Sequence, residues 1–276
     1  MGKFDGQVVM VTGGARGQGR SHAIEFAREG ADVIVTDIAS QIDTVPYELS
    51  SQEDLLQTQS MVEDLDRRCL AITADARSTE ATGAAVDAAI EQFGKIDILL
   101  INHGVVSMSA MVDISDDMWD DMLGVCLTGV FKTMRAVVPH MIEQNYGRIV
   151  ATSSIAGKVG LGTISHYVAA KAGVLALVKS VAAEVADKGI TVNAICPTAV
   201  DTDMIHNQAN YTLFAPHIEV PTKDDVIAGF ASSNAIPIPW IEPIDISNAM
   251  MFLASKEARY ITGASLNVSA GGYFVA

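Results

Sequence analysis

Residues 8–20 read VVMVTGGARGQGR, and this short stretch decides the fold class of the chain. Its first four residues are apolar and predict a buried strand, the glycines Gly13, Gly17 and Gly19 predict a tight turn, and a helix is predicted directly afterwards. Glycines let a backbone approach a pyrophosphate group closely, and the N-terminus of a helix offers that group unpaired N–H donors. The stretch therefore predicts a strand, turn and helix that bind a dinucleotide.

A second predicted strand, residues 32–37, ends in the carboxylate of Asp37. An acidic residue roughly 20 positions beyond the glycines accepts hydrogen bonds from the ribose hydroxyls of NAD and repels the additional phosphate of NADP. Arg16, just before Gly17, is placed to attract that phosphate instead. No basic residue follows Asp37 directly, so we expect NAD as the cofactor and Arg16 as a solvated loop charge.

Strand and helix signals alternate along the chain, which predicts an α/β fold with a Rossmann-type, doubly wound parallel sheet of seven strands in one domain, residues 1–276. Several strands are almost continuous apolar runs, as expected when helices cover both faces of a sheet. Strands are predicted near residues 7–12, 32–37, 69–73, 97–102, 147–153, 190–196 and 264–269. Helices are predicted near residues 19–29, 51–67, 79–92, 115–144, 165–187, 223–230 and 245–254.

Ser154, Tyr167 and Lys171 form a second group of reactive residues. Tyr167 and Lys171 stand four positions apart in an apolar stretch that predicts a helix, so their side chains share one face. A neighbouring ammonium group stabilises a phenolate and lowers the pKa of tyrosine from its usual value of about 10. The pair therefore predicts a group that exchanges a proton with a substrate.

In this order, the glycine turn, Asp37 and the three reactive residues resemble the short-chain dehydrogenase/reductase family, from about Lys3 to the C-terminus. The resemblance implies hydride transfer between NAD and a secondary alcohol or its ketone. It makes Tyr167 the acid and base, with Ser154 and Lys171 as the other catalytic residues. It also implies cofactor contacts from Gly13, Arg16, Gly17, Gln18, Gly19, Asp37, Asp75, Ala76, Asn102, Gly104, Tyr167, Lys171, Pro197, Val200 and Thr202.

Two residues depart from the pattern of that family. Cys126 stands where the family usually has an asparagine, which holds a water molecule that links the lysine to solvent. A thiol is a weak hydrogen-bond donor and acceptor, so the relay is expected to be slower, to use another group or to matter less. His103 replaces the alanine of an Asn-Ala-Gly motif, and we expect it to be packed or hydrogen-bonded rather than catalytic.

Residues 38–50, IASQIDTVPYELS, exceed the usual two to six residues between a strand and the following helix. One interpretation is a surface insertion without a role. However, the insertion, residues 18–22 and residues 200–204 together resemble the mycofactocin-associated short-chain dehydrogenases, which include the carveol dehydrogenases. That resemblance implies an insertion that covers the cofactor, so that NAD stays bound and is re-oxidised in place by an external redox carrier.

Residues 203–243 are rich in proline, asparagine and aromatic side chains, and by the same resemblance they form a substrate lid. Met204, Phe214 and Trp240 would then line a largely apolar pocket for a carveol-like cyclic terpenoid alcohol. Two alternatives stay open. One is a dehydrogenase with freely exchanging NAD that acts on another secondary alcohol, and the other is an NAD-binding protein without catalytic activity.

The composition excludes several other classes of protein. Eighteen basic residues against 33 acidic ones give a net charge of −15, which is unfavourable for binding nucleic acid. No uninterrupted apolar run approaches the ~20 residues of a membrane span, and no signal peptide is apparent. Three scattered cysteines without metal-ligand spacing fit a reducing compartment. We expect a cytoplasmic, metal-free protein, and the family resemblance implies a homotetramer.

Overall fold

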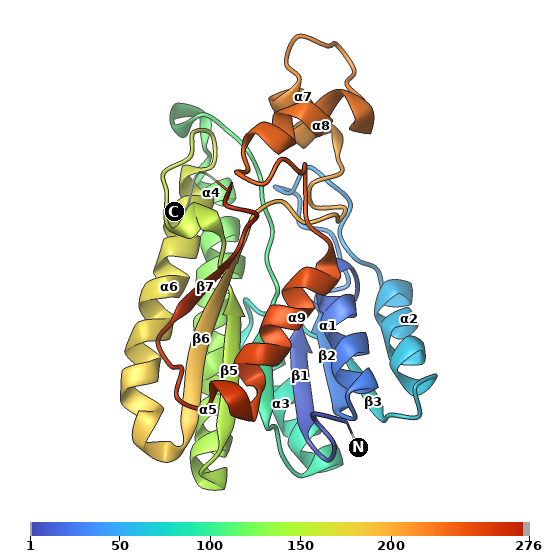
Figure 1. Cartoon of the computed structure of the whole chain (residues 1–276), viewed down its shortest axis with the longest axis vertical. Helices are drawn as coiled ribbons and strands as arrows, with labels where there is room; N and C mark the ends of the chain where they lie inside the picture. The colour runs from blue at the N-terminus through green and yellow to red at the C-terminus, as the bar shows by residue number, and fades with distance from the viewer. Residues whose placement is uncertain (1, 273–276) are drawn as a thin grey trace.

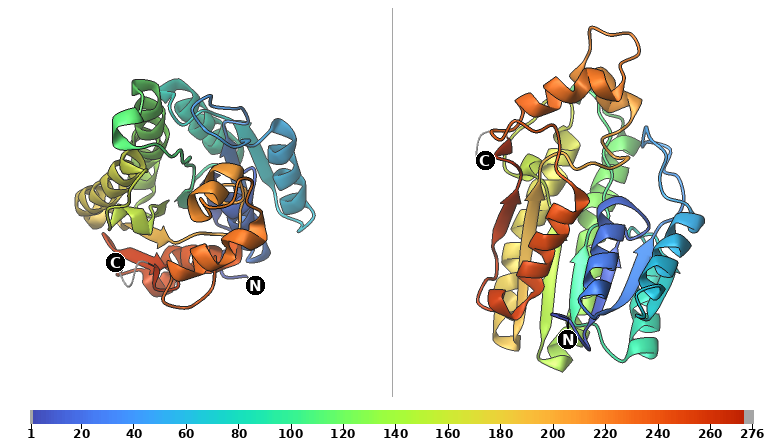
Figure 2. Two further views of the ribbon diagram at one scale, coloured as in Figure 1. Left: turned by 90° about the horizontal axis from the view of Figure 1, so that it is seen from above. Right: turned by 45° about the vertical axis from the view of Figure 1, so that its right-hand side comes forward.

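The computed structural model describes residues 2–272. Its centre is a parallel sheet of seven strands in the order β3-β2-β1-β4-β5-β6-β7, with helices on both faces (Figures 1 and 2). The strands are β1 (Val8–Thr12), β2 (Asp32–Asp37), β3 (Cys69–Thr73), β4 (Ile98–Ile101), β5 (Gly147–Thr152), β6 (Ile190–Pro197) and β7 (Ser265–Val268). The predicted α/β class and the doubly wound, seven-stranded sheet are therefore confirmed.

Two hydrophobic cores lie between the sheet and its helices. Strand β1 contributes to both, because Val9 and Val11 face one core and Val8 and Met10 face the other. This alternation is the period of two that side chains follow along a strand. One face of the sheet is covered by α1 (Gly17–Arg28), α2 (Gln52–Glu63) and α9 (Pro243–Ala254), and the other by α3 (Thr79–Phe93), α5 (Val130–Gln144) and α6 (Ser165–Val185).

The helix predicted over residues 115–144 is continuous but not uniform. It begins with α4 (Asp116–Leu123), continues as a π-helical segment at Gly124–Gly129, and ends with α5. A π-helical segment has i→i+5 backbone hydrogen bonds, which make it wider than an α-helix, and it often marks a functional site. Cys126 lies in this segment, so the local widening of the helix occurs where the sequence departs from the family pattern.

By length and composition alone, the helix at residues 116–144 could cross a membrane. Its apolar side chains have another explanation, because Val130, Met134, Val137 and Met141 are buried in the second core. The helix therefore has the pattern of a core helix of a compact domain.

Two short helices, α7 (Gln208–Phe214) and α8 (Lys223–Ser232), stand above the carboxyl ends of the strands, at the top of Figure 1. Helix α8 was predicted, whereas α7 was not, since its seven residues are too few to show a helical period. Helix α2 was predicted to reach residue 67 but ends at residue 63, and Asp66 beyond it has a left-handed backbone with φ of 57°. Short 3-10 turns lie at Met111–Asp113, Ile155–Gly157, Ala186–Lys188 and Lys256–Ala258.

The close contact of α1 with the glycine turn gives a prediction about stability. A Cβ atom at Gly19 would lie 2.0 Å from the carbonyl oxygen of Gly13. Gly19→Ala should therefore lower the free energy of unfolding by about 1–3 kcal/mol, the usual cost of overpacking. Gly83→Ala is the control, because a Cβ atom there meets nothing within 4 Å in the middle of α3.

Urea denaturation of the two variants measures the difference. The control should be more stable than the original protein by about 0.5–1 kcal/mol, since alanine favours a helix over glycine. A Gly19→Ala protein as stable as the original would contradict the described contact.

Candidate active site

Two adjoining cavities lie at the carboxyl ends of the strands, where open α/β sheets bind their ligands. The first lies over the glycine turn and the end of β2, and the second lies over the end of β5 and the start of α6, beneath the two lid helices. The walls of both include Gln18, Asn102, Gly104, Thr202 and Met204. The cavities are therefore two halves of one cleft.

The structure places the predicted cofactor-binding and catalytic residues in these two halves, with one exception. The first half is lined by Gly13, Arg16, Gly17, Gln18, Asp37, Asp75, Ala76, Asn102, Gly104 and Thr202. The second half is lined by Ser154, Tyr167, Lys171, Pro197 and Val200. Gly19 lines neither half, and it contributes by letting α1 pack against the glycine turn.

The glycine turn forms a floor without side chains. Gly13 and Gly17 have φ angles of +65° and +54°, a region that favours glycine. A Cβ atom at Gly13 would lie 2.7 Å from the Cα atom of His103, and one at Gly17 would lie 3.1 Å from Cγ2 of Thr202. No side chain caps the N-terminus of α1. These features fit a pyrophosphate, because the first N–H groups of a helix attract an anion.

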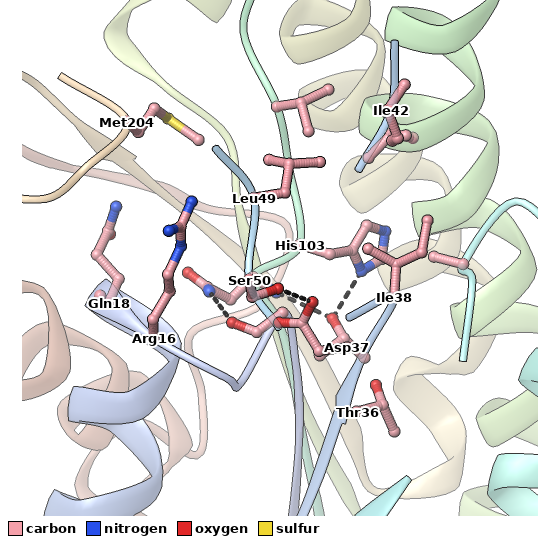
Figure 3. Close-up of a pocket in the computed structure, with 18 of the residues that line it drawn as sticks. Arg16, Gln18, Thr36, Asp37, Ile38, Ile42, Leu49, Ser50, His103 and Met204 are labelled. Atoms are coloured by element: carbon pink, nitrogen blue, oxygen red, sulfur yellow. Dashed lines mark hydrogen bonds between the residues drawn. The ribbon is translucent and has the colours of Figure 1, made fainter. Parts of the chain in front are cut away.

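Asp37 is held in place at the edge of the first cavity. Its Oδ1 accepts a hydrogen bond from Ser50 Oγ at 2.6 Å (Figure 3) and one from the Ala39 N–H at 3.3 Å. Its Oδ2 accepts a hydrogen bond from the Ala15 N–H at 3.1 Å. An ionised carboxylate has about four acceptor sites, so these three bonds leave capacity for a further donor. The group therefore fits a ribose hydroxyl, as the sequence predicted.

The prediction that Arg16 is a solvated loop charge is wrong. Its guanidinium group donates to the carbonyl oxygen of Glu48 and lies 3.1 Å from the Asp203 carboxylate. The side chain is only 24% exposed. Arg16 therefore joins the insertion at residues 38–50 to the start of the lid at residue 203, through its two terminal guanidinium nitrogens.

The insertion at residues 38–50 packs into the protein as a wall of the first cavity. Ile42, Val45 and Tyr47 are at most 9% exposed, in a cluster with side chains of the π-helical segment. Tyr47 Oη accepts a hydrogen bond of 3.2 Å from the Val106 N–H. Because these anchors lie on the opposite wall, the insertion spans the cleft.

A single side chain organises the backbone of the insertion. The amide nitrogen of Gln41 lies 3.1 Å from each of three carbonyl oxygens, those of Ile42, Val45 and Tyr47. The amide oxygen of Gln41 accepts a hydrogen bond of 3.0 Å from the Leu49 N–H. The insertion thus has a defined shape although it contains no helix or strand.

The three predicted catalytic residues meet in the second cavity. Tyr167 and Lys171 are one turn apart in α6, with Lys171 Nζ at 5.6 Å from the centroid of the tyrosine ring. Lys171 Nζ also donates to the carbonyl oxygen of Thr152 at 2.9 Å. Ser154 follows the end of β5, and its Oγ accepts a hydrogen bond of 3.1 Å from the Ala156 N–H. The structure thus brings these groups together as the spacing predicted.

The electrostatic prediction for Tyr167 is wrong, however. Burial raises the pKa of the Tyr167 phenol, and a hydrogen bond with Ser154 only partly opposes this shift. Burial also lowers the pKa of Lys171. Removal from water penalises both charged forms, so the tyrosine holds its proton more firmly than the spacing alone suggested.

Cys126 makes two hydrogen bonds to one residue of the loop after β4. Its Sγ lies 3.3 Å from the Val105 carbonyl oxygen and 3.4 Å from the Val105 nitrogen, and the side chain is fully buried. The thiol therefore fixes this loop against the π-helical segment.

His103 is packed and hydrogen-bonded, which confirms its prediction. Its Nδ1 lies 2.7 Å from Thr12 Oγ1, and burial lowers its pKa to about 4. The imidazole is consequently neutral near pH 7, and it stabilises the floor of the first cavity.

The second cavity is largely apolar, and one of its three predicted lid residues is misplaced. Met204 and Phe214 line it as predicted. Trp240 does not, because its ring packs edge-on against Phe230 and His206, at centroid distances of 5.8 and 4.8 Å. The sequence missed much of the apolar wall, which comes from separate segments and includes Val106, Met108, Ile155, Leu161, Ile164, Ile205, Leu213 and Phe230.

The role of Gln41 can be tested by hydrogen exchange. Gln41→Ala removes the side-chain amide, whose two hydrogens and one acceptor oxygen make about three hydrogen bonds to the insertion, each worth about 1 kcal/mol. Amide exchange in residues 42–49 should become at least about tenfold faster, while global stability changes little, because the insertion opens locally. Gln59→Ala is the control, since its side chain donates a hydrogen bond to the exposed Glu63 on α2, away from the insertion backbone. Unchanged amide exchange in the Gln41 variant would contradict the claim that this side chain holds the backbone of the insertion in place.

Comparisons with known proteins agree with this geometry. Residues 7–211 match the short chain dehydrogenase family. The (-)-trans-carveol dehydrogenase of Rhodococcus erythropolis is 45% identical over 98% of this chain and 99% of its own. The crystal structure of carveol dehydrogenase from Mycobacterium avium in complex with NAD has a TM-score of 0.97 and 43% identity over the whole of both chains. An NAD-bound short chain dehydrogenase from Mycobacterium paratuberculosis has a TM-score of 0.89 and 33% identity, also over the whole of both chains. This chain therefore belongs to the short chain dehydrogenase family.

Proposed function

We propose that the protein is an NAD-dependent oxidoreductase that interconverts a hydrophobic secondary alcohol, of the carveol-like cyclic terpenoid class, and its ketone. One observation carries the proposal: Ser154, Tyr167 and Lys171 line an apolar cavity that is continuous with the cavity over the glycine turn. The similarity to a (-)-trans-carveol dehydrogenase supports the substrate class.

The charges around the first cavity support NAD rather than NADP. The Asp37 carboxylate is fixed at the cavity edge by Ser50 and two backbone N–H groups. Arg16, the nearby cation that could neutralise an additional phosphate, is paired with the Asp203 carboxylate and donates to the Glu48 carbonyl oxygen. A phosphate at this edge would meet an uncompensated carboxylate, which is unfavourable. The NAD complexes among the similar structures agree with this preference.

The chain's own residues supply the proton chemistry. When bound, NAD accepts the hydride from the carbinol carbon, and its oxidised ring brings a positive charge. Tyr167 takes the hydroxyl proton, so that an alcohol yields a ketone, and it returns the proton in the reverse direction. Ser154 donates a hydrogen bond to the substrate oxygen and orients it. Lys171 holds its charge beside the phenol and favours the phenolate.

We propose further that NAD stays bound between turnovers and is re-oxidised by an external carrier of the mycofactocin kind. The wall formed by residues 38–50 and its connection to Asp203 through Arg16 support this retention. Freely exchanging NAD is the alternative.

Two further proposals rest on the family resemblance. The first is that the protein is a homotetramer, and the second is that it is located in the cytoplasm. The exposed aromatic side chains of Trp119 and Phe131, on the helix at residues 116–144, support a contact between subunits there.

Tyr167→Phe tests the proposed chemistry. The variant keeps the ring but loses the proton-transfer group, so carveol oxidation with an artificial electron acceptor should fall by at least about 100-fold. Nucleotide content should remain that of the original protein. Tyr260→Phe, at a tyrosine that is 87% exposed, is the control and should be fully active. Unchanged turnover in the Tyr167 variant would exclude the assignment.

The bridge through Arg16 gives a prediction about cofactor release. Arg16→Gln and Asp203→Asn should each release radiolabelled NAD about two to five times faster in a chase with excess NAD, because a partly exposed ion pair contributes about 0.2–1 kcal/mol. The double variant should be no faster than Arg16→Gln, since both changes remove one interaction. Arg28→Gln, which removes an exposed ion pair with Glu25 at the far end of α1, is the control. If the two changes had additive effects on the rate of NAD release, or no effect on it, the proposed role of the Arg16–Asp203 pair would be contradicted.

A further inference from the structure

The lid is joined to the rest of the protein by a narrow neck, where the chain enters and leaves it. Val200, after β6, forms an isolated β-bridge with Ile241, which lies just before α9. The Asp201 N–H donates to the Ile241 carbonyl oxygen at 2.9 Å, and the Ile241 N–H donates to the Ala199 carbonyl oxygen at 3.1 Å. The carboxylate of Asp201 therefore stands on backbone that is held at the end of β6.

A cluster of polar and aromatic side chains surrounds this carboxylate, and His206 is at its centre. Nε2 of His206 is hydrogen-bonded to Oδ1 of Asp201, and Nδ1 lies 3.0 Å from Oη of Tyr211. The His206 ring packs edge-on against Trp240, at a centroid distance of 4.8 Å. Lys223 Nζ lies 3.4 Å from the same Asp201 oxygen and 4.8 Å from the centroid of the Trp240 ring. These five residues, which we call the neck cluster, connect the neck with α7, with the start of α8 and with the segment before α9.

The lid also has a small hydrophobic core of its own, separate from the two cores beside the sheet. Ala215, Val226 and Phe230 are buried in it, and Tyr211 and Trp240 of the neck cluster pack against it. The lid helices stand above the sheet (Figure 1). A unit with its own core can tilt about the segments that join it to the domain, so the contacts at the neck govern its orientation.

The neck cluster lies directly behind the wall of the second cavity. None of its five members lines either cavity. However, Met204 and Ile205 immediately precede His206, and Phe214 lies three positions beyond Tyr211 in α7. Met204, Ile205 and Phe214 all line the second cavity. A shift of His206 or Tyr211 would therefore move the apolar surface that faces the substrate.

A histidine suits the centre of this cluster because its ring can donate one hydrogen bond and accept another. A carboxylate only accepts hydrogen bonds, so Nε2 of His206 donates to Asp201, and Nδ1 of the neutral ring accepts from the Tyr211 hydroxyl. The side chains of His206 and Asp201 are only 15% and 29% exposed. Loss of one partner would therefore leave the other poorly compensated by water.

We propose that His206 is a positioning residue that fixes the lid over the substrate cavity and thereby determines the preference for a ring-sized alcohol over a small one. This inference rests on the proposed function and deepens it, since it assigns the selection of substrate size to a residue outside both cavities. A cyclic terpenoid alcohol is large enough to touch the wall formed by the lid, whereas 2-propanol is not. Contacts with that wall are made before and during hydride transfer alike, so their loss raises KM and leaves kcat nearly unchanged.

Steady-state oxidation of carveol and of 2-propanol, with an artificial electron acceptor, tests this role. His206→Leu removes both hydrogen bonds, so KM for carveol should rise about tenfold, while its kcat and the KM for 2-propanol change less than about twofold. His206→Gln can still donate to Asp201 and accept from Tyr211, so it should restore most of the original KM for carveol. His217→Leu, at an exposed histidine of the same lid, is the control and should change neither substrate's kinetics.

Amide hydrogen exchange follows the lid without any turnover. Exchange in residues 208–214 should become about tenfold faster in His206→Leu, because α7 loses its connection to the neck, and it should return toward the original rate in His206→Gln. If His206→Leu folds poorly, Tyr211→Phe removes one of the two hydrogen bonds and keeps the aromatic ring. That variant should raise KM for carveol about threefold.

The possible results separate this inference from the function on which it rests. An unchanged KM for carveol in His206→Leu, or in Tyr211→Phe where the first variant folds poorly, would overturn the role of His206. An equal loss of activity toward both alcohols would also overturn it, because that result indicates general damage to the site. If the original protein oxidised neither alcohol while the exchange in α7 responded as expected, the proposed function and the selection of substrate size would both be wrong, although the neck cluster would still hold the lid.

Discussion

Asn102 ties together the carboxyl ends of three neighbouring strands, and both cavities rest on this connection. Its backbone N–H donates to Thr12 Oγ1 at 3.1 Å, and its amide nitrogen donates to the Gly13 carbonyl oxygen at 3.1 Å. Its amide oxygen accepts a hydrogen bond of 3.4 Å from Thr152 Oγ1. Strands β1, β4 and β5 are adjacent in the sheet. These bonds therefore hold the glycine turn, which follows β1, close to the end of β5, which Ser154 follows. They also reinforce the pairing of β1 with β4 and of β4 with β5 at the end of the sheet where Gly13 and Ser154 lie.

The insertion and the lid helices form walls of the cleft above this floor. The insertion packs on the loop after β4 through Tyr47 and Val106, and Arg16 connects it to the lid. Such burial strengthens every electrostatic interaction inside the cleft, but it also raises the pKa of Tyr167. A raised pKa keeps Tyr167 protonated at neutral pH, which is the state that the donation step of ketone reduction requires. For alcohol oxidation, Lys171 and the charge of an oxidised nicotinamide must together offset the cost of burial.

The parts that could be predicted from the sequence depend on local patterns. Apolar runs gave all seven strands, and the spacing of Tyr167 and Lys171 placed both side chains on one face of a helix. The errors arose where distant segments meet. The partners of Arg16 lie 32 and 187 positions away, and no local pattern identifies them. Trp240 was assigned to the cavity by its apolar character, which serves packing behind the wall equally well. The pKa of Tyr167 depends on burial, which spacing does not reveal.

The central claim is that a covered cleft holds NAD, and the nucleotide content of the purified protein tests it most directly. The protein is desalted extensively and denatured, and the nucleotide in the supernatant is identified and quantified. The account predicts close to one equivalent of NAD or NADH per chain. An empty protein would contradict the covered cleft and favour freely exchanging NAD. Recovery of NADP would contradict the role assigned to Asp37.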